Sequence, residues 1–262
     1  MIRKKANSFT IFSNVIFAFF MRELKTRFGQ KKYGYFWMFV EPLFHILILS
    51  FIFSGLGRTV SLNISFPMFL LLGLLPYFLF NNISNKVMDA VSANRGLLAY
   101  SPVKIIDPII ARVLLEVMIS TLTFITVSLV FIMADFFYPP EDILKFVLMI
   151  FVLVIFSFSL GLIFAIIKEY YEDFNKVTSI ILKPLYYTSG IFYTAEMIPT
   201  TYREYFLYNP ILVFIEAMRA FWFKEYTDKY VNYEYIFGLT LFLLALSLYM
   251  YKNNQEVFKV IK

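Results

Sequence analysis

The sequence predicts an all-α membrane protein with six transmembrane helices, an amphipathic interface helix before them, and short re-entrant helices before the last span. Hydrophobic residues make up 60% of the 262 residues, against roughly 45–50% in a soluble domain, and the mean hydropathy is +0.71. A helix needs about 20 apolar residues to cross a bilayer, and windows close to this length lie at 36–56, 66–83, 108–134, 143–167, 176–194 and 234–251. We therefore expect residues 1–262 to form a single transmembrane domain.

The basic residues predict how these spans are oriented. Sixteen Lys and Arg residues fall in the segments that would share one side of the membrane, namely 1–34, 84–107, 168–176 and 252–262. The opposite side has five, which are Arg58, Arg203, Arg219, Lys224 and Lys229. Because the basic side of a membrane protein faces the cytoplasm, we expect both termini there. The N-terminal region lacks the cleavage pattern of a signal peptide.

Residues 1–34 are predicted to contain a helix that lies in the cytoplasmic interface. Apolar residues between Phe9 and Phe20 recur at helical spacing, and Arg22, Lys25 and Arg27 follow them. Apolar burial and attraction to anionic head groups would hold such a helix at the membrane surface. The simpler alternative is that it only anchors the first span.

Charged residues inside the predicted spans are candidates for structural pairs or for a transport pathway. Glu41 and His45 share a helical face in the first span. Arg112 and Glu116 have the same spacing in the third span, and we expect them to pair with each other. Lys183 precedes Pro184 near the middle of the fifth window. It is expected either to face a pathway or to pair with a carboxylate such as Glu41.

Two segments between spans are unlike simple loops. In 84–107 polar and apolar residues alternate, which favours an amphipathic helix that docks on a cytoplasmic partner; the alternative is a solvated loop. In 195–233, Asn209 and Pro210 form a helix-start pattern. The apolar stretch 211–223 that follows is too short to span, so it predicts a re-entrant or interfacial helix.

The sequence also excludes several chemistries. It has no cysteine and one histidine, so thiolate and multi-histidine metal sites are excluded. No P-loop, zinc-protease, nucleophile-elbow or dinucleotide-binding motif is present. We therefore expect a protein that is not an enzyme, with no bound cofactor or metal and no nucleic-acid partner. Any energy source would be another polypeptide.

Four stretches resemble those of ABC-2 type exporter permeases, and most of all the branch that exports capsular polysaccharide. They are residues 21–37 followed by Glu41-Pro42; 73–80; 189–193 with Ile198-Pro199; and Asn209-Pro210 followed by Arg219. The resemblance covers nearly the whole chain in the expected order. One departure is Tyr171-Glu172-Asp173, where many relatives have an Arg-Asp pair.

The resemblance implies a permease homodimer in the bacterial inner membrane, with two separate ATPase subunits that bind Mg-ATP on the cytoplasmic side. Residues 84–98 would be the coupling helix that contacts the ATPase, and helices within 195–224 would close the outer mouth. The candidate coupling residues are Asp89, Asn94, Arg95, Leu97 and Leu98. The resemblance also implies the substrate of this branch, a long acidic polysaccharide on a phospholipid-type lipid anchor, which passes to periplasmic and outer-membrane export proteins.

The composition is compatible with such a substrate, because 21% of the residues are aromatic and aromatic faces stack on sugar rings. The candidate pathway residues are the aromatic Tyr35, Trp37, Tyr186, Tyr187 and Tyr193, the basic Arg22, Arg27 and Lys183, and Glu41. The basic side chains would attract an acidic polymer. The alternative is that most aromatic residues face lipid or pack in the core.

Other functions compatible with the sequence are export of O-antigen, teichoic acid or a small lipophilic drug by the same architecture. An ion-driven secondary transporter would require midplane carboxylates and internal repeats, and neither is clear. An intramembrane enzyme such as a lipid-sugar transferase would need a cluster of acids or histidines, and the single histidine argues against it.

Overall fold

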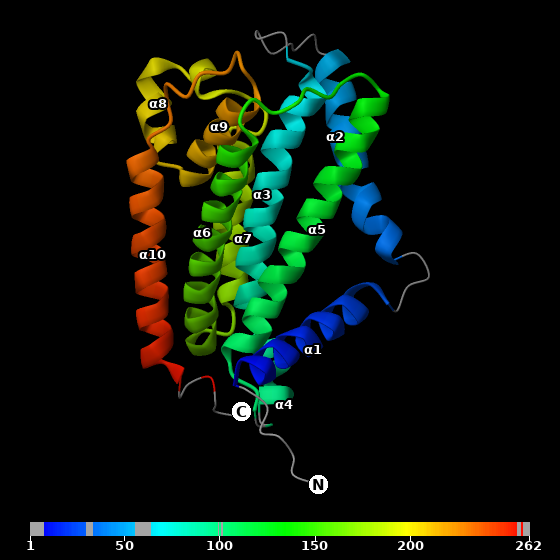
Figure 1. Ribbon diagram of the computed structural model, residues 1–262. Helices are drawn as coiled ribbons and strands as arrows, with labels where there is room; N and C mark the ends of the chain where they lie inside the picture. The colour runs from blue at the N-terminus through cyan, green and yellow to red at the C-terminus, as the bar shows by residue number, and fades with distance from the viewer. Residues whose placement is uncertain are drawn as a thin grey trace.

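The computed structural model describes residues 8–29, 34–55, 64–98, 100, 102–255 and 258, and within this part of the chain the regular elements are all helical. Six helices run along the long axis of the molecule (Figure 1); they are α2 (Gly34–Gly55), α3 (Phe66–Met88), α5 (Ile106–Met133), α6 (Ile143–Tyr170), α7 (Phe174–Thr188) and α10 (Tyr233–Asn253). Helix α1 (Ser8–Phe28) crosses one end obliquely, and α8 (Thr200–Leu207) and α9 (Pro210–Trp222) cover the opposite end. We call these the α1 end and the α9 end. The predicted all-α class is confirmed.

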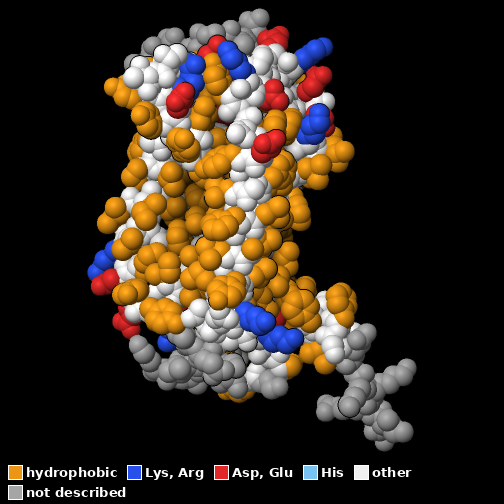
Figure 2. Space-filling view, turned by 90° about the vertical axis from the view of Figure 1, so that its left-hand side faces the viewer, with side chains coloured by type: hydrophobic (Ala, Val, Ile, Leu, Met, Phe, Trp, Pro, Cys, Tyr) orange, Lys and Arg blue, Asp and Glu red, His pale blue; other side chains and the backbone are white. Residues whose placement is uncertain are grey.

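The surface agrees with a membrane environment. Figure 2 shows hydrophobic side chains in a broad belt over the middle of one face, with the charged side chains gathered near the two ends. Four helices, α3, α5, α6 and α10, are long and apolar enough to cross a bilayer. Helix α2 has a shorter apolar stretch, Val40–Phe53, and α7 has 15 residues.

Helix α3 forms the centre of the core. Of its most apolar stretch, 72% is buried, against 17% for α10, and it packs against α2, α5, α6 and α9. Its contact with α6 is close at Gly161. A Cβ atom on Gly161 would lie 2.8 Å from the Cβ of Val87 and 2.9 Å from the carbonyl oxygen of Ser84.

The fifth predicted span is shorter than the window 176–194. Helix α7 ends at Thr188, and Gly190 has a φ of +71°. That left-handed conformation is readily adopted only by glycine, and it turns the chain back over the α9 end. The predicted helical continuation to residue 194 is therefore wrong.

The prediction of a single helix over 84–98 is also wrong. Helix α3 continues through this segment to Met88, and it is followed by a 3-10 turn, Ser92–Asn94, and by the one-turn helix α4, Arg95–Leu98. We call residues 89–98 the α4 segment. It lies at the α1 end (Figure 1).

Helix α1 has one packed face. Phe28 forms a small buried cluster with Leu115 and Ile119 of α5, whereas Phe9 and Phe17 are exposed. A helix with one packed face and exposed aromatic residues agrees with the predicted interface position. This packing fixes α1 against the start of α5, where the charged residues described next are located.

Candidate functional site

Ion pairs join α1 to α5 at the α1 end. Arg27 pairs with Glu116, and Arg112 pairs with Glu23 at 2.9 Å and also donates to the carbonyl of Lys86 at 3.0 Å. The predicted pair between Arg112 and Glu116 is therefore wrong. Their spacing within α5 permits such a pair, but α1 crosses α5 at this level and brings an opposite charge to each.

The α4 segment is held by the same kind of contact. Asp89 pairs with Lys168 and Arg95 with Glu169, both at the end of α6. Arg22 of α1 donates to the side chain of Asn94, which is buried. Three candidate coupling residues, Asp89, Asn94 and Arg95, thus have partners inside the chain. Leu97 is half-buried, and Leu98 packs against the main hydrophobic core.

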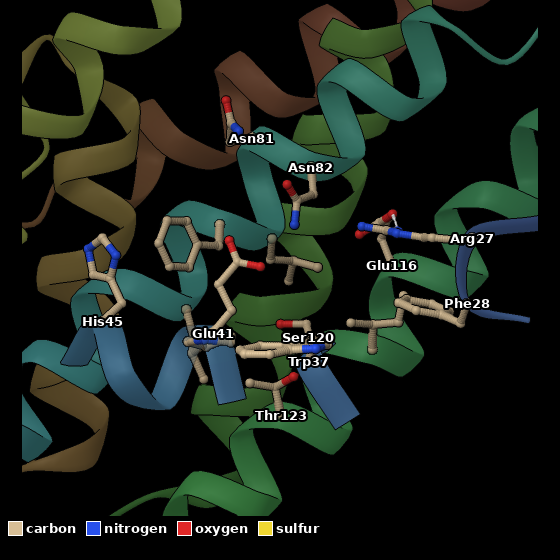
Figure 3. A pocket seen from close by; sticks show the side chains of 15 residues that line it. Arg27, Phe28, Trp37, Glu41, His45, Asn81, Asn82, Glu116, Ser120 and Thr123 are labelled. Carbon is tan, nitrogen blue, oxygen red and sulfur yellow. Dashed lines mark hydrogen bonds and ion pairs between the residues drawn. The ribbon is translucent and has the colours of Figure 1, made fainter. Parts of the chain in front are cut away.

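A cavity of about 470 Å³ lies between α1, α2, α3 and α5 (Figure 3), and we call it the inner cavity. It brings together three of the candidate pathway residues: Arg27, Trp37 and Glu41. Its other lining residues are Phe28, Pro42, His45, Leu75, Phe78, Leu79, Asn81, Asn82, Glu116, Ile119, Ser120 and Thr123.

A second hollow of about 420 Å³ lies between α3 and α7, and it brings together the candidates Lys183, Tyr186 and Tyr187. Its remaining lining residues are Tyr77, Asn81, Asn85, Ser179 and Leu182. Lys183 is exposed, and among the described residues it has no ion-pair partner, so the alternative of a pair with Glu41 is not seen. Asn81 lines both hollows.

The two hollows are linked through His45 and Tyr186, whose Nε2 and hydroxyl lie 2.8 Å apart. The rings of Phe78 and Tyr186 are stacked, and His45 meets Phe78 edge to face. This contact joins α2 to α7 across α3. The only histidine of the sequence therefore has a position between the two hollows, which its isolation in the sequence did not indicate.

Three pathway candidates lie elsewhere. Arg22 contacts the α4 segment. Tyr193 is half-buried at the α9 end against Phe206. The side chain of Tyr35 lies outside the described residues. The predicted pathway set is thus divided between two hollows, the α4 segment and the α9 end.

The α9 end is built around Arg219, which is fully buried. Its guanidinium donates to the carbonyls of Gly190 (2.7 Å), Ile191 (3.0 Å), Tyr193 (3.2 Å) and Phe69 (3.2 Å), and it lies 3.5 Å over the Phe69 ring. These contacts hold the loop that follows α7 against α9 and α3.

Further contacts complete this arrangement. Glu216 lies 3.7 Å from Arg219 and accepts a hydrogen bond of 2.7 Å from Tyr226. Burial raises the pKa of the Tyr226 phenol, so the phenol keeps its proton and remains the donor. Asn209 caps α9 by accepting from the backbone of Ile211 at 3.0 Å, and its amide donates to Thr188 and Ser189.

Several residues of this site were missed from the sequence. Tyr77, Asn81, Asn82, Ser120 and Thr123 line the hollows, and Glu23 pairs with Arg112. Two adjacent asparagines in an apolar helix are a usable signal, because an amide inside a membrane requires a partner. The hydroxyls of Ser120 and Thr123 gave no comparable signal.

The apolar belt, the helices long enough to cross a bilayer and the polar hollows between them define a multi-pass helical membrane protein. The chain belongs to the ABC-2 type transporter family, whose model matches residues 14–223. It is therefore a transporter membrane subunit.

Similar proteins cover nearly the whole chain. Polysialic acid transport protein KpsM of Escherichia coli is 40% identical over 239 residues, which are 91% of this chain and 93% of KpsM. Capsule polysaccharide export inner-membrane protein BexB of Haemophilus influenzae is 31% identical over 257 residues, covering 94% and 93%. O-antigen export system permease protein RfbA of Klebsiella pneumoniae is 26% identical over 233 residues, covering 87% and 88%.

Proposed function

We propose that this chain is the permease subunit of an ATP-driven exporter that moves lipid-anchored, acidic capsular polysaccharide across the bacterial inner membrane. The observation that carries the proposal is the 40% identity to a polysialic acid transport protein over 91% of the chain. The capsule-export relatives quoted above are 31–40% identical, and the O-antigen relative is 26% identical. This difference favours capsular polysaccharide over O-antigen.

The proposed assembly is a homodimer with two cytoplasmic ATPase subunits that bind Mg-ATP. Each permease chain would cross the membrane six times, through α2, α3, α5, α6, α7 and α10, with both termini in the cytoplasm. The unequal distribution of Lys and Arg supports this orientation. The α4 segment and α1 would then be at the cytoplasmic face, and α8 and α9 would form the outer mouth as re-entrant helices.

The proposed pathway follows the face where α2, α3 and α7 meet. The hollow beside Lys183 supports this position, since it combines Tyr186 and Tyr187 with a cation that forms no ion pair among the described residues. A cation would attract an acidic polymer, and aromatic rings would stack on its sugars. Binding must stay weak at each site so that the polymer can move. On the outer side the polymer would pass to periplasmic and outer-membrane export proteins.

Co-purification tests the exporter class. The tagged chain is extracted in mild detergent from its own host, and the eluate is analysed by mass spectrometry and by an ATPase assay. We expect a P-loop ATPase in equal stoichiometry. Recovery of the chain without an ATPase would contradict the proposal and would favour the ion-driven secondary transporter.

A deletion strain tests the substrate. Loss of the gene is expected to remove capsular polysaccharide from the cell surface and to leave it inside the cell, with O-antigen unchanged. Loss of O-antigen alone would contradict the capsule assignment while leaving the exporter class intact.

A further inference from the structure

Helix α7 carries a row of polar side chains along its whole length. Asn175, Ser179, Lys183 and Tyr187 recur every fourth residue, so they lie on one side of the helix, and all four are exposed. The row begins in the first turn of α7, which follows the end of α6 at the α1 end, and it ends beside Thr188, whose carbonyl is bonded to the capping residue of α9. It therefore connects the two ends of the molecule.

A second polar row lies on α3. Tyr77, Asn81 and Asn85 have the same spacing of four residues, and they line the hollow of about 420 Å³ together with Ser179 and Lys183 of α7. Most of α3 is buried, but Asn81 and Asn85 are only half-buried, because this part of the helix is open to the hollow. Since one turn of a helix rises by about 5.4 Å, each row offers a polar group at nearly every turn.

Both rows have hydrogen-bonding groups that the chain itself does not use. The amide nitrogen of Asn85 donates to the carbonyl and to the side-chain oxygen of Asn81, at 2.8 and 3.1 Å. Among the described residues, the amide nitrogen of Asn81, the amide oxygen of Asn85 and the hydroxyl of Ser179 make no hydrogen bond. The hollow thus presents a free donor, a free acceptor and a free hydroxyl.

The polar side of α7 is unsuited to lipid. A lysine that faces the hydrocarbon of a bilayer is costly, and charged groups within a span usually line a water-filled cavity. Val177 and Ile181 are each two residues from a member of the row, so they lie on the opposite side of the helix, and both are exposed. That apolar side can face lipid or another subunit, whereas we expect the polar side to face a water-filled passage.

The groups of the two rows match the chemistry of a sugar chain. Each sugar unit carries hydroxyls that donate and accept, as amide and hydroxyl side chains do, and Lys183 adds one cation for acidic groups. Repetition suits a polymer, because successive turns of the helices offer similar groups to successive units. Neutral hydrogen bonds are individually weak, so a bound chain can shift from one turn to the next.

We propose that Asn81, Asn85 and Ser179 are substrate-binding residues, which hold sugar hydroxyls as the polysaccharide moves along the hollow between α3 and α7. This inference rests on the proposed function and adds what the pathway recognises. Lys183 interacts with the acidic groups of the polymer, and the three neutral residues interact with its hydroxyls whatever the charge of the sugar. The pathway then selects a sugar chain by two separate features.

Thiol labelling in nanodiscs tests whether the polar rows face water. The sequence contains no cysteine, so a single cysteine in the permease–ATPase complex gives an unambiguous signal. Ser179→Cys is compared with Ile181→Cys, which places the thiol on the opposite side of the same helix. We expect a charged methanethiosulfonate reagent to modify Ser179→Cys at least tenfold faster than Ile181→Cys. Equal rates would overturn the proposal.

Protection from the reagent tests the ligand. The probes are oligosaccharides cut from the capsular polysaccharide of the chain's own host, and the same oligosaccharides after their carboxylates have been reduced to alcohols. We expect both probes to slow the modification of Ser179→Cys, and the acidic probe to do so at a lower concentration. Protection by neither probe, or by the acidic probe alone, would overturn the binding of hydroxyls.

Second substitutions in the Ser179→Cys chain separate the two features. Asn85→Leu is expected to raise the concentration for half-protection roughly two- to tenfold for both probes, as for one neutral hydrogen bond. Lys183→Gln is expected to raise it for the acidic probe only. Thr121→Val, which removes a hydroxyl bonded to its own helix, is expected to raise it for neither. An unchanged value in Asn85→Leu, or an equal rise in Thr121→Val, would contradict the assignment.

Two controls keep the outcomes distinct. Thermal unfolding shows whether each variant is folded, and Asn81→Leu takes the place of Asn85→Leu if that variant is not. If the ATPase co-purifies and capsule reaches the cell surface, but Ser179→Cys is not protected, the assignment of the neutral residues fails and the proposed function stands. Disulfide formation between two copies of Ser179→Cys, without modification by the reagent, would place the row in a subunit interface and would also overturn the inference.

Discussion

The two ends of the molecule use charged residues in different ways. At the α9 end, one buried arginine, Arg219, is surrounded by four backbone carbonyls from the loop after α7 and from α3. At the α1 end, ion pairs between a partly exposed arginine and a buried glutamate, such as Arg27–Glu116 and Arg95–Glu169, join separate elements. A charged side chain thus holds the backbone at the α9 end, whereas ion pairs hold side chains of separate elements together at the α1 end.

The comparison indicates where motion is possible. The four backbone carbonyls around Arg219, which we call the carbonyl cradle, cannot exchange this partner unless the backbone moves. Loss of these contacts would leave the buried charge of Arg219 uncompensated, which is costly. An ion pair between two side chains, one of them a partly exposed arginine, can exchange partners by side-chain rotation without moving the backbone. We therefore expect the α9 end to behave as one rigid block and the α1 end to rearrange when the proposed ATPase partner closes.

The largest effect is expected from Arg219→Met. The substitution leaves four carbonyls without their donor and Glu216 without its cation, so it should destabilise the fold by roughly 3–5 kcal/mol. Thermal unfolding in detergent measures this loss. Lys224→Met, which alters an exposed residue of the same end, should change stability little. Equal effects of the two substitutions would contradict the role of the cradle.

The next effect is expected from Gly73→Ala. A Cβ atom at Gly73 would lie 2.7 Å from Nη2 of Arg219 and 3.1 Å from the Cα of Ile191, so the cradle must shift, at a cost of about 1–3 kcal/mol. Gly238 of α10 is the matched control, since its Cβ would meet nothing within 4 Å. Gly238→Ala should be neutral or stabilising. A Gly73→Ala variant as stable as the unmodified protein would contradict tight packing around Arg219 at the α9 end.

A smaller effect is expected at the α1 end. A double-mutant cycle with Arg27→Gln and Glu116→Gln should give a coupling energy of about 1–2 kcal/mol, because Glu116 is buried and Arg27 is about one-third exposed. The exposed pair Lys176–Asp173 should give less than about 0.5 kcal/mol. If the two pairs coupled equally weakly, the ion pairs would not hold α1 in place.

The smallest effect on stability, with a large effect on transport, is expected from Leu97→Asp. Leu97 is half-buried in the α4 segment, whereas Leu98 packs against the main core, so substituting Leu97 alone leaves the core contact of Leu98 intact. We expect loss of ATPase binding with normal membrane insertion. Met197→Asp, at the α9 end, should retain the ATPase. Normal co-purification and export by Leu97→Asp would show that the coupling assignment is wrong.

Features that depend on a single helix were predictable from the sequence. Four of the apolar windows correspond to helices long enough to cross a bilayer, α3, α5, α6 and α10, because bilayer thickness sets the length of a span. The Asn209-Pro210 pattern correctly placed the start of α9, since capping is local.

Features that depend on two elements were not predictable. Arg112 and Glu116 have the spacing of a pair, yet each binds a residue of α1, whose crossing point the sequence does not reveal. The same applies to Ser120 and Thr123, which face the inner cavity, and to their neighbour Thr121, which bonds to its own helix. Only the packing of α5 against α2 and α3 distinguishes them.

Hydrogen–deuterium exchange on the permease–ATPase complex tests the central claim most directly. Exchange is compared with and without a non-hydrolysable ATP analogue. The account predicts changed protection in α1 and the α4 segment, and unchanged protection in residues 189–193 and in α9. Changed protection in residues 189–193 and α9, with α1 and the α4 segment unaffected, would contradict it.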